Sequence, residues 1–521
     1  MARPMLLPLL LVLAACGPRQ AEAPAPLALE VPNTGADPEL PPPDTAASVT
    51  RLSVIRPWPE GRTPTAPPGF RVSLYADGFQ RPRWLHVLPN GDVLVAESAN
   101  PGVPRDTLQP PEWIAARWAS GNRGHSANRI MLLRDADGDG RAERRIPLLW
   151  GLNRPVGMLY LDGWLYVANT DQLVRYPFQP GDTAIMVPPR PILDLPGGGY
   201  NNHWTRNVVA SADGRKLYVS VGSATNVDTE EIDAKDPRRA AILEVNPDGS
   251  GMRVFASGLR NPVGMDWAPG GALWTVVNER DGLGDDLVPD YLTSVRDGAF
   301  YGWPYAYWGK HEDPRQVGKR PDLVARSIPP DFALGAHTAS LGLVFYRGAA
   351  FPERYRGGAF VGQRGSWNRS ALAGYRVLFV PFSGGRPAGP AELFLGGFVA
   401  DSAKGEVYGR PVGVAELPDG SLLVVDDPAN RIWRVAHTGG NAGATTAQGG
   451  TAPRRIATLA GELARPEAVR WDPDQRVWFV SNINGRQEKD NNGYLSRVRP
   501  DGRMEVARFV AGGVGGVTLH A

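Results

Sequence analysis

The sequence is short of cysteine, of net charge and of long apolar runs, and each shortage excludes a class of protein. Its 521 residues contain one cysteine, Cys16, so intramolecular disulfides and Cys-x-x-Cys-His haem attachment are excluded. Lys and Arg number 56 against 54 Asp and Glu, a formal net charge of +2, without the strongly basic balance of a nucleic-acid binder. The apolar run from Met5 to Leu13 is too short to cross a bilayer.

The amino terminus has the pattern of an exported lipoprotein. The short apolar run is followed by Leu13-Ala14-Ala15-Cys16, which resembles a bacterial lipobox. A lipobox cysteine is acylated and becomes the new amino terminus; the alternative is an ordinary signal peptide with an incidental cysteine. We expect residues 1–16 to be the signal and Cys16 to carry a lipid at the periplasmic face. Because Gly17 rather than Asp follows, the expected destination is the outer membrane if the source is Gram-negative.

Residues 17–68 form an alanine- and proline-rich stretch. Such a composition buries little apolar surface, so it predicts an extended tether between the lipid and the body of the protein.

An internal repeat organises the body of the chain. A typical copy has a basic start, a strand, an Asp-Gly or Asn-Gly type of turn and a second strand, followed by further strand-like runs, and the fifth copy is a degenerate form of this pattern. Four strands per copy and six copies predict an all-β, six-bladed β-propeller over residues 69–437. The segment 69–74 is expected to pair with the last blade and close the ring. The copies begin at Arg81, Arg154, Arg206, Arg260, Leu341 and Arg410.

A seventh copy follows a flexible linker at residues 438–453. It begins at Arg465, and the motif Val480-Ser481-Asn482-Ile483-Asn484-Gly485 resembles the start of gluconolactonase-like (SMP-30 type) propellers. Residues 454–521 hold too few strands for a second ring. They are either a partial second propeller or one extra blade packed on the main ring.

The repeat places arginines at equivalent positions around one axis, at the mouth of the central channel. Like charges gathered there repel one another unless an anion lies between them. The alternative is that each arginine only precedes proline or asparagine in a solvated turn. The arginines concerned are Arg81 or Arg83, Arg154, Arg206, Arg260 and Arg410.

Two of the seven histidines, His203 and His337, directly precede inner strands. An unperturbed pKa near 6.5 makes such a histidine a candidate base, although a structural role is the alternative. The aromatic run 300–308 is either a platform for a sugar or planar cofactor or a satellite hydrophobic cluster. The carboxylates at Asp135, Asp137 and Asp139 alternate as in a calcium loop, but Ile146 stands where an EF-hand has glutamate, which favours a polar hairpin turn.

Three motifs make residues 68–435 resemble the PQQ-dependent soluble aldose dehydrogenases, in particular the sorbosone and pyranose dehydrogenases. They are the segments 257–264, with Arg260-Asn261-Pro262, 301–304, and 362–369, with Gly365-Ser366-Trp367. The resemblance implies a propeller that holds PQQ and Ca²⁺ at the channel mouth and oxidises a sugar or sugar-derived aldehyde. Electrons would pass to an external quinone or cytochrome.

The resemblance also implies roles for particular residues. His203 resembles the general base, and the loop 279–282, with Asp281 and Gly282, resembles the calcium loop, whose ligands in relatives are backbone carbonyls. The residues that it implies for cofactor binding are Arg83, Arg206, Arg260, Asn261, Arg364, Trp367, Asn368 and Arg410.

The sequence departs from the glucose dehydrogenases at three places. Asn202 stands where they have a carboxylate before the base, Val412 replaces a second arginine after Arg410, and the loop 279–282 lacks their His-Gly-Pro. The sequence leaves two other functions open. A propeller lactone hydrolase needs carboxylate and amide ligands in the channel, which an arginine-rich channel disfavours, and a non-catalytic propeller would bind a glycan or protein without any cofactor.

Overall fold

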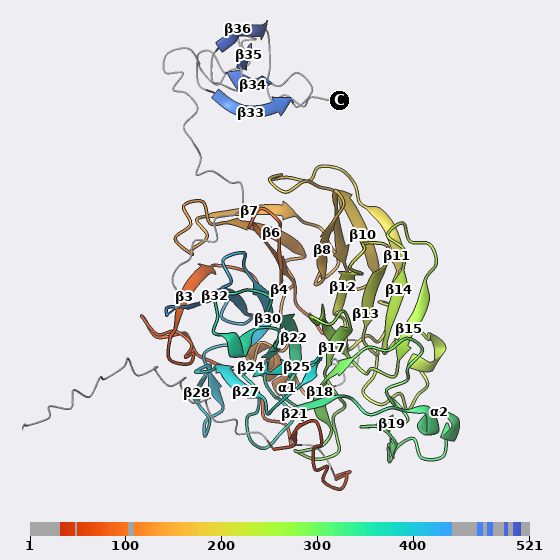
Figure 1. Cartoon of the computed structure of the whole chain (residues 1–521). Helices are drawn as coiled ribbons and strands as arrows, with labels where there is room; N and C mark the ends of the chain where they lie inside the picture. The colour runs from red at the N-terminus through yellow and green to blue at the C-terminus, as the bar shows by residue number, and fades with distance from the viewer. Residues whose placement is uncertain are drawn as a thin grey trace, which may run out of the picture. The chain divides into compact units, whose positions relative to one another are not determined.

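The computed structural model describes residues 32–46, 49–102 and 109–439, and beyond them four strands between residues 466 and 511. The lipobox with Cys16 and residues 440–453 of the predicted linker 438–453 lie outside the described residues. The described chain is nearly all β, with two short α-helices (Figure 1).

Six antiparallel sheets follow one another along residues 70–437 (Figure 1). Each has a core of four strands, and apart from the pairing of β3 with β32 each strand pairs with the one that follows it in the same sheet, which is the up-and-down order of a propeller blade. The sheets are β4 (Pro82–Val87), β5 (Val93–Glu97), β6 (Arg129–Arg134) and β7 (Arg144–Leu149); β8 (Met158–Leu161), β9 (Trp164–Ala168), β10 (Gln172–Pro177) and β11 (Arg190–Asp194); β12 (Arg206–Ala210), β13 (Leu217–Val221), β14 (Ala241–Val245) and β15 (Arg253–Ser257); β16 (Pro262–Trp267), β17 (Leu273–Val277), β18 (Pro289–Ser294) and β21 (Phe332–Ala336); β22 (Ser340–Phe345), β23 (Ala359–Gln363), β24 (Arg376–Val380) and β27 (Glu392–Leu395); and β30 (Pro411–Glu416), β31 (Leu422–Asp426), β32 (Arg431–His437) and β3 (Phe70–Asp77).

The first strands of the six sheets contact one another in cyclic order. Strand β4 contacts β8, β8 contacts β12, and the series continues through β16, β22 and β30 back to β4. The sixth sheet takes its outer strand from the start of the body, because β3 pairs antiparallel with β32 from Phe70 opposite His437 to Asp77 opposite Arg431. The predicted pairing of this segment with the last sheet is therefore confirmed.

The hydrophobic core lies between neighbouring sheets. Several of its buried clusters combine residues of two consecutive sheets, as where Leu173 and Leu243 belong to one cluster. One cluster joins the first sheet to the sixth, through Val95 and Ile432. Sheet faces buried on both sides explain why the inner strands carry nearly continuous apolar runs.

Residues 33–66 do not form the free tether that their composition predicts. Strand β1 (Thr34–Gly35) pairs with β21, and β2 (Val54–Ile55) pairs in parallel with β29 (Glu406–Val407), which pairs with β28 (Val399–Asp401). The indole of Trp58 is buried, and its Nε1 donates to Asp426 Oδ2 at 2.9 Å. The segment is extended and proline-rich, yet its amides satisfy strand edges and its aromatic side chain fills a core position.

The remaining described elements are short. Helices α1 and α2 span nine and six residues, and neither they nor any other described helix could cross a bilayer. The elements are α1 (Pro111–Ala119), α2 (Pro321–Arg326), the 3₁₀ turns η2 (Asp233–Lys235) and η3 (Glu353–Tyr355), and the two-residue strands β19 (Ala306–Tyr307), β20 (His311–Glu312), β25 (Phe382–Ser383) and β26 (Arg386–Pro387).

The chain divides into two compact units, Met1–Ala442 and Gly443–Ala521. In the second unit the described strands form one four-stranded antiparallel sheet, in which each strand pairs with the next. Its strands are β33 (Pro466–Asp472), β34 (Val477–Asn482), β35 (Tyr494–Val498) and β36 (Met504–Ala511).

Candidate functional site

A cavity of about 1030 Å³, including its open mouth, lies where the loops before the first strands meet the loops after the second strands. Five of the six sheets contribute lining residues, and the second sheet is the exception. The loop between β5 and β6, which contains α1, adds a further wall. The lining is mostly polar, which suits a charged or hydroxylated ligand better than an apolar one.

The cavity carries a strong excess of positive charge. Seven arginines line it, against two carboxylates, Asp281 and Asp427. Because the whole chain is close to neutral, this charge is a local property of the site. The arginines are Arg81, Arg83, Arg117, Arg123, Arg260, Arg364 and Arg410.

His203 lies in the loop before β12, and its hydrogen bonds fix its tautomer. Nδ1 lies 2.8 Å from the carbonyl oxygen of Ser223 and 2.9 Å from its hydroxyl oxygen. A carbonyl can only accept, and the Ser223 hydroxyl already donates to the carbonyl of Thr225 at 2.7 Å. Nδ1 must therefore carry the proton, and Nε2 keeps its lone pair as an acceptor.

Electrostatics keep His203 uncharged. Burial first, and then the positive charge of Arg260, hold the pKa of His203 well below its ordinary value. A neutral imidazole with a free Nε2 can accept a proton from a substrate hydroxyl. Gly222 allows this placement, since a Cβ there would lie 2.6 Å from Cβ of His203 and 2.5 Å from Oδ1 of Asn261.

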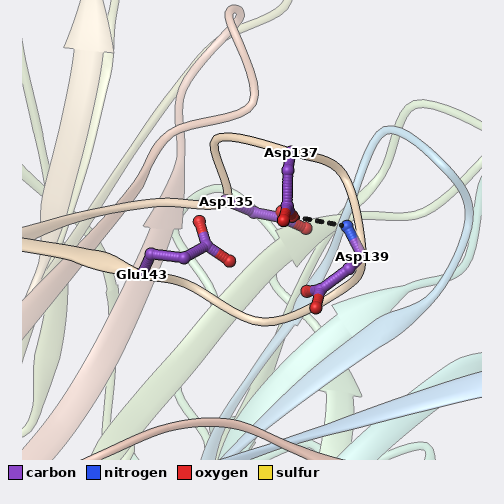
Figure 2. Close-up of side chains that lie close together, drawn as sticks. All are labelled: Asp135, Asp137, Asp139 and Glu143. Carbon is purple, nitrogen blue, oxygen red and sulfur yellow. Dashed lines mark hydrogen bonds between the residues drawn. The ribbon is translucent and has the colours of Figure 1, made fainter.

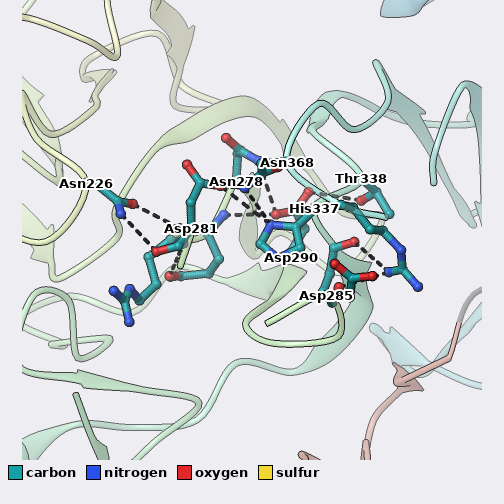
Figure 3. Close-up of polar contacts among 12 residues, drawn as sticks. Asn226, Asn278, Asp281, Asp285, Asp290, His337, Thr338 and Asn368 are labelled. Atoms are coloured by element: carbon teal, nitrogen blue, oxygen red, sulfur yellow. Dashed lines mark hydrogen bonds and ion pairs between the residues drawn. The ribbon is translucent and has the colours of Figure 1, made fainter. Parts of the chain in front are cut away.

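Asp281, in the loop after β17, interacts with three polar side chains (Figure 3). Its Oδ1 accepts a 2.5 Å hydrogen bond from Asn368 and lies 3.5 Å from Nδ1 of His337. Its Oδ2 lies 3.5 Å from Nη2 of Arg260. Burial opposes ionisation, but His337 and Arg260 together hold the pKa of Asp281 well below its usual range. Asp281 is therefore an anion that faces the cavity.

A second buried carboxylate, Asp427, follows β31. Its Oδ2 lies 2.5 Å from Nη1 of Arg83 and 2.7 Å from Nε of Arg364, and its Oδ1 lies 3.7 Å from Nη1 of Arg81. One carboxylate thus faces three guanidinium groups. Arg410, in contrast, donates to the carbonyls of Ser120, Arg364 and Gly365.

Several buried polar atoms of the cavity wall have no hydrogen-bond partner among the described residues. They are Nη1 of Arg81, Nε of Arg83, Nδ2 of Asn122 and Oδ1 of Asn261. Buried polar groups are rarely left unsatisfied, so three donors and one acceptor in one cavity indicate a ligand that is rich in acceptors. A planar compound with several carboxylates fits this donor set.

Comparison with known proteins identifies the family of the chain. Residues 193–373 match the family model for glucose/sorbosone dehydrogenase, and residues 312–438 match a TrAA12-like model. An uncharacterized protein of Borreliella burgdorferi is 32% identical over 298 residues, which are 54% of this chain and 76% of that protein. The chain belongs to the glucose/sorbosone dehydrogenase family.

Solved structures support the fold of this glucose/sorbosone dehydrogenase family member. A Trichoderma reesei carbohydrate-active enzyme of family AA12 has a TM-score of 0.58 at 19% identity, covering 75% of this chain and all of that one. The holo form of the pyranose dehydrogenase PQQ domain from Coprinopsis cinerea has a TM-score of 0.57 at 19% identity, covering 73% and 98%. At these identities the likeness concerns the fold alone.

The structure brings most of the predicted site residues of the family member together. They come from five different sheets, which explains why no single motif of the sequence contains them. Those that line the cavity are Arg83, His203, Arg260, Asn261, Asp281, Arg364, Trp367, Asn368 and Arg410.

Arg206 is a correction, because the structure places it outside the cavity lining. Its guanidinium is fully buried and donates to the backbone carbonyls of His203, Thr205 and Pro196. Arg206 is already the first residue of β12, whereas Arg260 precedes β16 by two residues. This shift in register turns Arg206 inward, where it supports the loop that carries His203.

The predicted calcium loop, residues 279–282, also differs from the prediction, in which backbone carbonyls are the ligands. The carbonyl of Glu279 accepts from Arg260, and that of Asp281 accepts from Asn226. Gly282 is not part of the cavity lining, so the carboxylate of Asp281 is the hard oxygen ligand that this loop presents there.

Two other sequence features lie apart from the cavity. The aromatic run 300–308 packs as a satellite cluster, with Tyr301 and Tyr307 buried among neighbouring apolar side chains. The carboxylates of Asp135, Asp137, Asp139 and Glu143 lie within 4.8 Å of one another in the hairpin between β6 and β7 (Figure 2). They accept hydrogen bonds from amides of the same loop, as at Gly138 and Gly140, which is the arrangement of a polar turn.

Sequence reasoning missed the wall that the loop around α1 provides. Arg117 lies with its guanidinium carbon 4.6 Å from the ring centre of Trp367 and 4.7 Å from that of Trp113. Asn122 and Asp427 were also missed. The adjacent carboxylates Asp426 and Asp427, directly after an apolar strand, were the signal that could have pointed to the latter.

Proposed function

We propose that the chain is a sugar dehydrogenase that depends on PQQ and Ca²⁺. Its substrate would be a sugar or a sugar-derived aldehyde, and its electrons would pass to an external quinone or cytochrome. We further propose that the six sheets are the blades of one closed propeller. The observation that carries the proposal is a cavity in which seven arginines surround one neutral histidine with a free Nε2.

Different residues of the chain would bind the cofactor and transfer the proton. PQQ, when bound, supplies a quinone that accepts hydride. Its three carboxylates suit the guanidinium groups of Arg83, Arg260 and Arg364, because charge-assisted hydrogen bonds are among the strongest that proteins make. The indole of Trp367 offers an apolar face to a planar group. Nε2 of His203 would take the proton of the substrate hydroxyl.

A divalent cation would be held by the carboxylate of Asp281. A carboxylate is the kind of oxygen ligand that Ca²⁺ prefers, and Asn368 and His337 fix its orientation. A bound cation would also offset the negative charge that a tricarboxylate brings into the cavity.

A separate proposal concerns the cellular location of the protein and is based on its amino terminus. We propose that the protein is exported and acylated at Cys16, and that this lipid is its membrane contact. Mass spectrometry of the mature amino terminus tests this directly. A terminus other than Cys16, or an unmodified Cys16, would contradict it.

The deciding experiment for the activity is reconstitution. Purified protein would be loaded with PQQ and Ca²⁺ and assayed by dye reduction over a panel of neutral sugars, sugar acids and sugar-derived aldehydes. Dye reduction that requires both PQQ and a sugar supports the proposal. Protein that neither binds PQQ nor reduces dye would instead support a propeller that only binds a ligand.

A further inference from the structure

The loop after α1 is shaped around Arg81. A Cβ on Gly121 would lie 2.8 Å from Nη1 of Arg81, and one on Gly124 would lie 3.0 Å from its Nε. Nη2 of Arg81 donates to the carbonyl of Arg123 at 3.4 Å. Two glycines therefore allow the guanidinium to lie against this loop, at the wall of the cavity.

The amide of Asn122 has a fixed orientation in the same loop. Its Oδ1 accepts from Nη1 of Arg364 at 3.1 Å and from Nη1 of Arg410 at 2.7 Å. Both neighbours are guanidinium groups, which can only donate, so the oxygen must face them. Nδ2 must then point away from them, and it is buried without a hydrogen-bond partner among the described residues.

These donors lie where positive charge is in excess. Asp427 is one carboxylate against Arg81, Arg83 and Arg364, which leaves two positive charges unbalanced. Nη1 of Arg81 and Nε of Arg83 remain without hydrogen-bond acceptors in the described chain. Arg83 is only 8% exposed, so bulk water does not readily replace the missing acceptor.

We infer that Arg81, Arg83 and Asn122 form a carboxylate-binding subsite in the cavity wall. The inference rests on the proposed function for its ligand, which is either a carboxylate of the cofactor or the acid group of a sugar acid. Arg81 and Asn122 would act together with the arginines that the family resemblance implied, and Asn122 would do so from a loop that the resemblance did not include.

The variant Asn122→Asp tests the subsite with little change of shape. It keeps an oxygen towards Arg364 and Arg410 but replaces the donor Nδ2 by a second oxygen, which repels an anion. Arg81→Leu is a second variant that removes charge without changing Asn122. Asn246→Asp is the matched control, because Asn246 lies in a turn outside the cavity lining.

Affinity for PQQ would be measured by quenching of tryptophan fluorescence. Affinities for citrate and for glucuronate would be measured by calorimetry, with glucose as the uncharged comparison for glucuronate. We expect Asn122→Asp and Arg81→Leu to weaken PQQ binding by about ten- to a hundred-fold, the loss of one or two charge-assisted hydrogen bonds. The control should bind as the parent protein does. Thermal unfolding midpoints near that of the parent would show that both variants fold.

The outcomes distinguish a cofactor carboxylate from a sugar acid as the ligand, and they test the subsite separately from the proposed function. Weaker PQQ binding assigns the subsite to the cofactor, whereas unchanged PQQ binding with a selective loss of glucuronate assigns it to an acidic substrate. If the parent protein binds citrate but not PQQ, and Asn122→Asp loses citrate, the dehydrogenase proposal fails and the subsite stands. If the variants bind all three compounds as the parent does, or the parent binds none, the subsite is refuted.

Discussion

Nδ1 of His203 lies within hydrogen-bond distance of two oxygens of Ser223, its backbone carbonyl at 2.8 Å and its hydroxyl at 2.9 Å. Because both oxygens accept, the proton is on Nδ1, and Nε2 is the basic atom. The hydrogen-bond partner of the proposed base is therefore neutral. Among the described residues Ser223, and not a carboxylate, accepts the Nδ1 proton.

The first prediction concerns the proposed base itself. His203→Ala should lower the turnover of protein loaded with PQQ and Ca²⁺ by roughly 100- to 10,000-fold, the usual contribution of a general base. Its PQQ affinity should remain close to that of the parent, because the guanidinium groups are untouched. Steady-state dye reduction and a PQQ titration measure the two quantities. If turnover survives, His337 becomes the candidate base and the role of His203 is wrong.

The second prediction follows from the neutral partner. Turnover should fall as the pH drops through the pKa of His203, which lies below 6.5 because burial and Arg260 both lower it. Ser223→Asp places a carboxylate on Nδ1–H, which stabilises the protonated imidazole and should move this acidic limb up by about 1–3 pH units.

The control for that experiment is Ser223→Asn, which has nearly the same shape as the aspartate variant without its charge. Its acidic limb should stay close to that of the parent. The same pH profile for both variants would mean that His203 is not the group whose protonation limits turnover.

The third prediction separates cofactor binding from proton transfer. Arg260→Ala should weaken PQQ binding by about ten- to a hundred-fold, and excess PQQ should restore part of the activity. Removing this charge should also raise the pKa of His203, so the acidic limb should move to higher pH. Arg141→Ala, in the hairpin before β7, is a control outside the cavity. Full PQQ affinity in Arg260→Ala would contradict the assignment.

The fourth prediction tests the docked amino-terminal segment. Trp58→Ala should lower the free energy of unfolding by about 3–5 kcal/mol, because it opens a cavity and leaves Asp426 without one of its donors. Trp150→Ala is the control, since Trp150 is 63% exposed and its loss should cost no more than about 0.5 kcal/mol. Urea denaturation measures both. Equal stabilities would mean that the segment is the loose tether that its composition suggested.

The fifth prediction concerns the second unit. A chain that ends at His437 retains β32, the partner of β3, together with all the residues that line the cavity. It should therefore fold and keep its PQQ affinity and turnover. Aggregation of the shortened chain would show that the carboxy-terminal unit belongs to the main body, which contradicts the predicted domain boundary.

Local patterns in the sequence were sufficient for the repeated strands. The runs that became β5, β13 and β31 were recognisable because inner strands of a propeller are apolar along their whole length. The pairing of residues 70–77 with the last sheet also followed from the sequence, since a ring of sheets leaves one edge to cover. The repeat then placed His203 and Arg260 at the same end of neighbouring sheets, and the resemblance implied their roles.

The sequence alone determined three things: the apolar inner strands, the repeat that contains them and the chemical class of the site. Only the tertiary structure decided which side chains face the cavity. A shift of two residues at the start of β12 buried Arg206 against carbonyls, and a loop from the first sheet brought Asn122 to Arg364, which lies 242 residues further along the chain. The core position of Trp58 also depends on a distant segment, because its indole lies beside Asp426. Register and long-range packing depend on contacts between distant segments, and no local pattern encodes these.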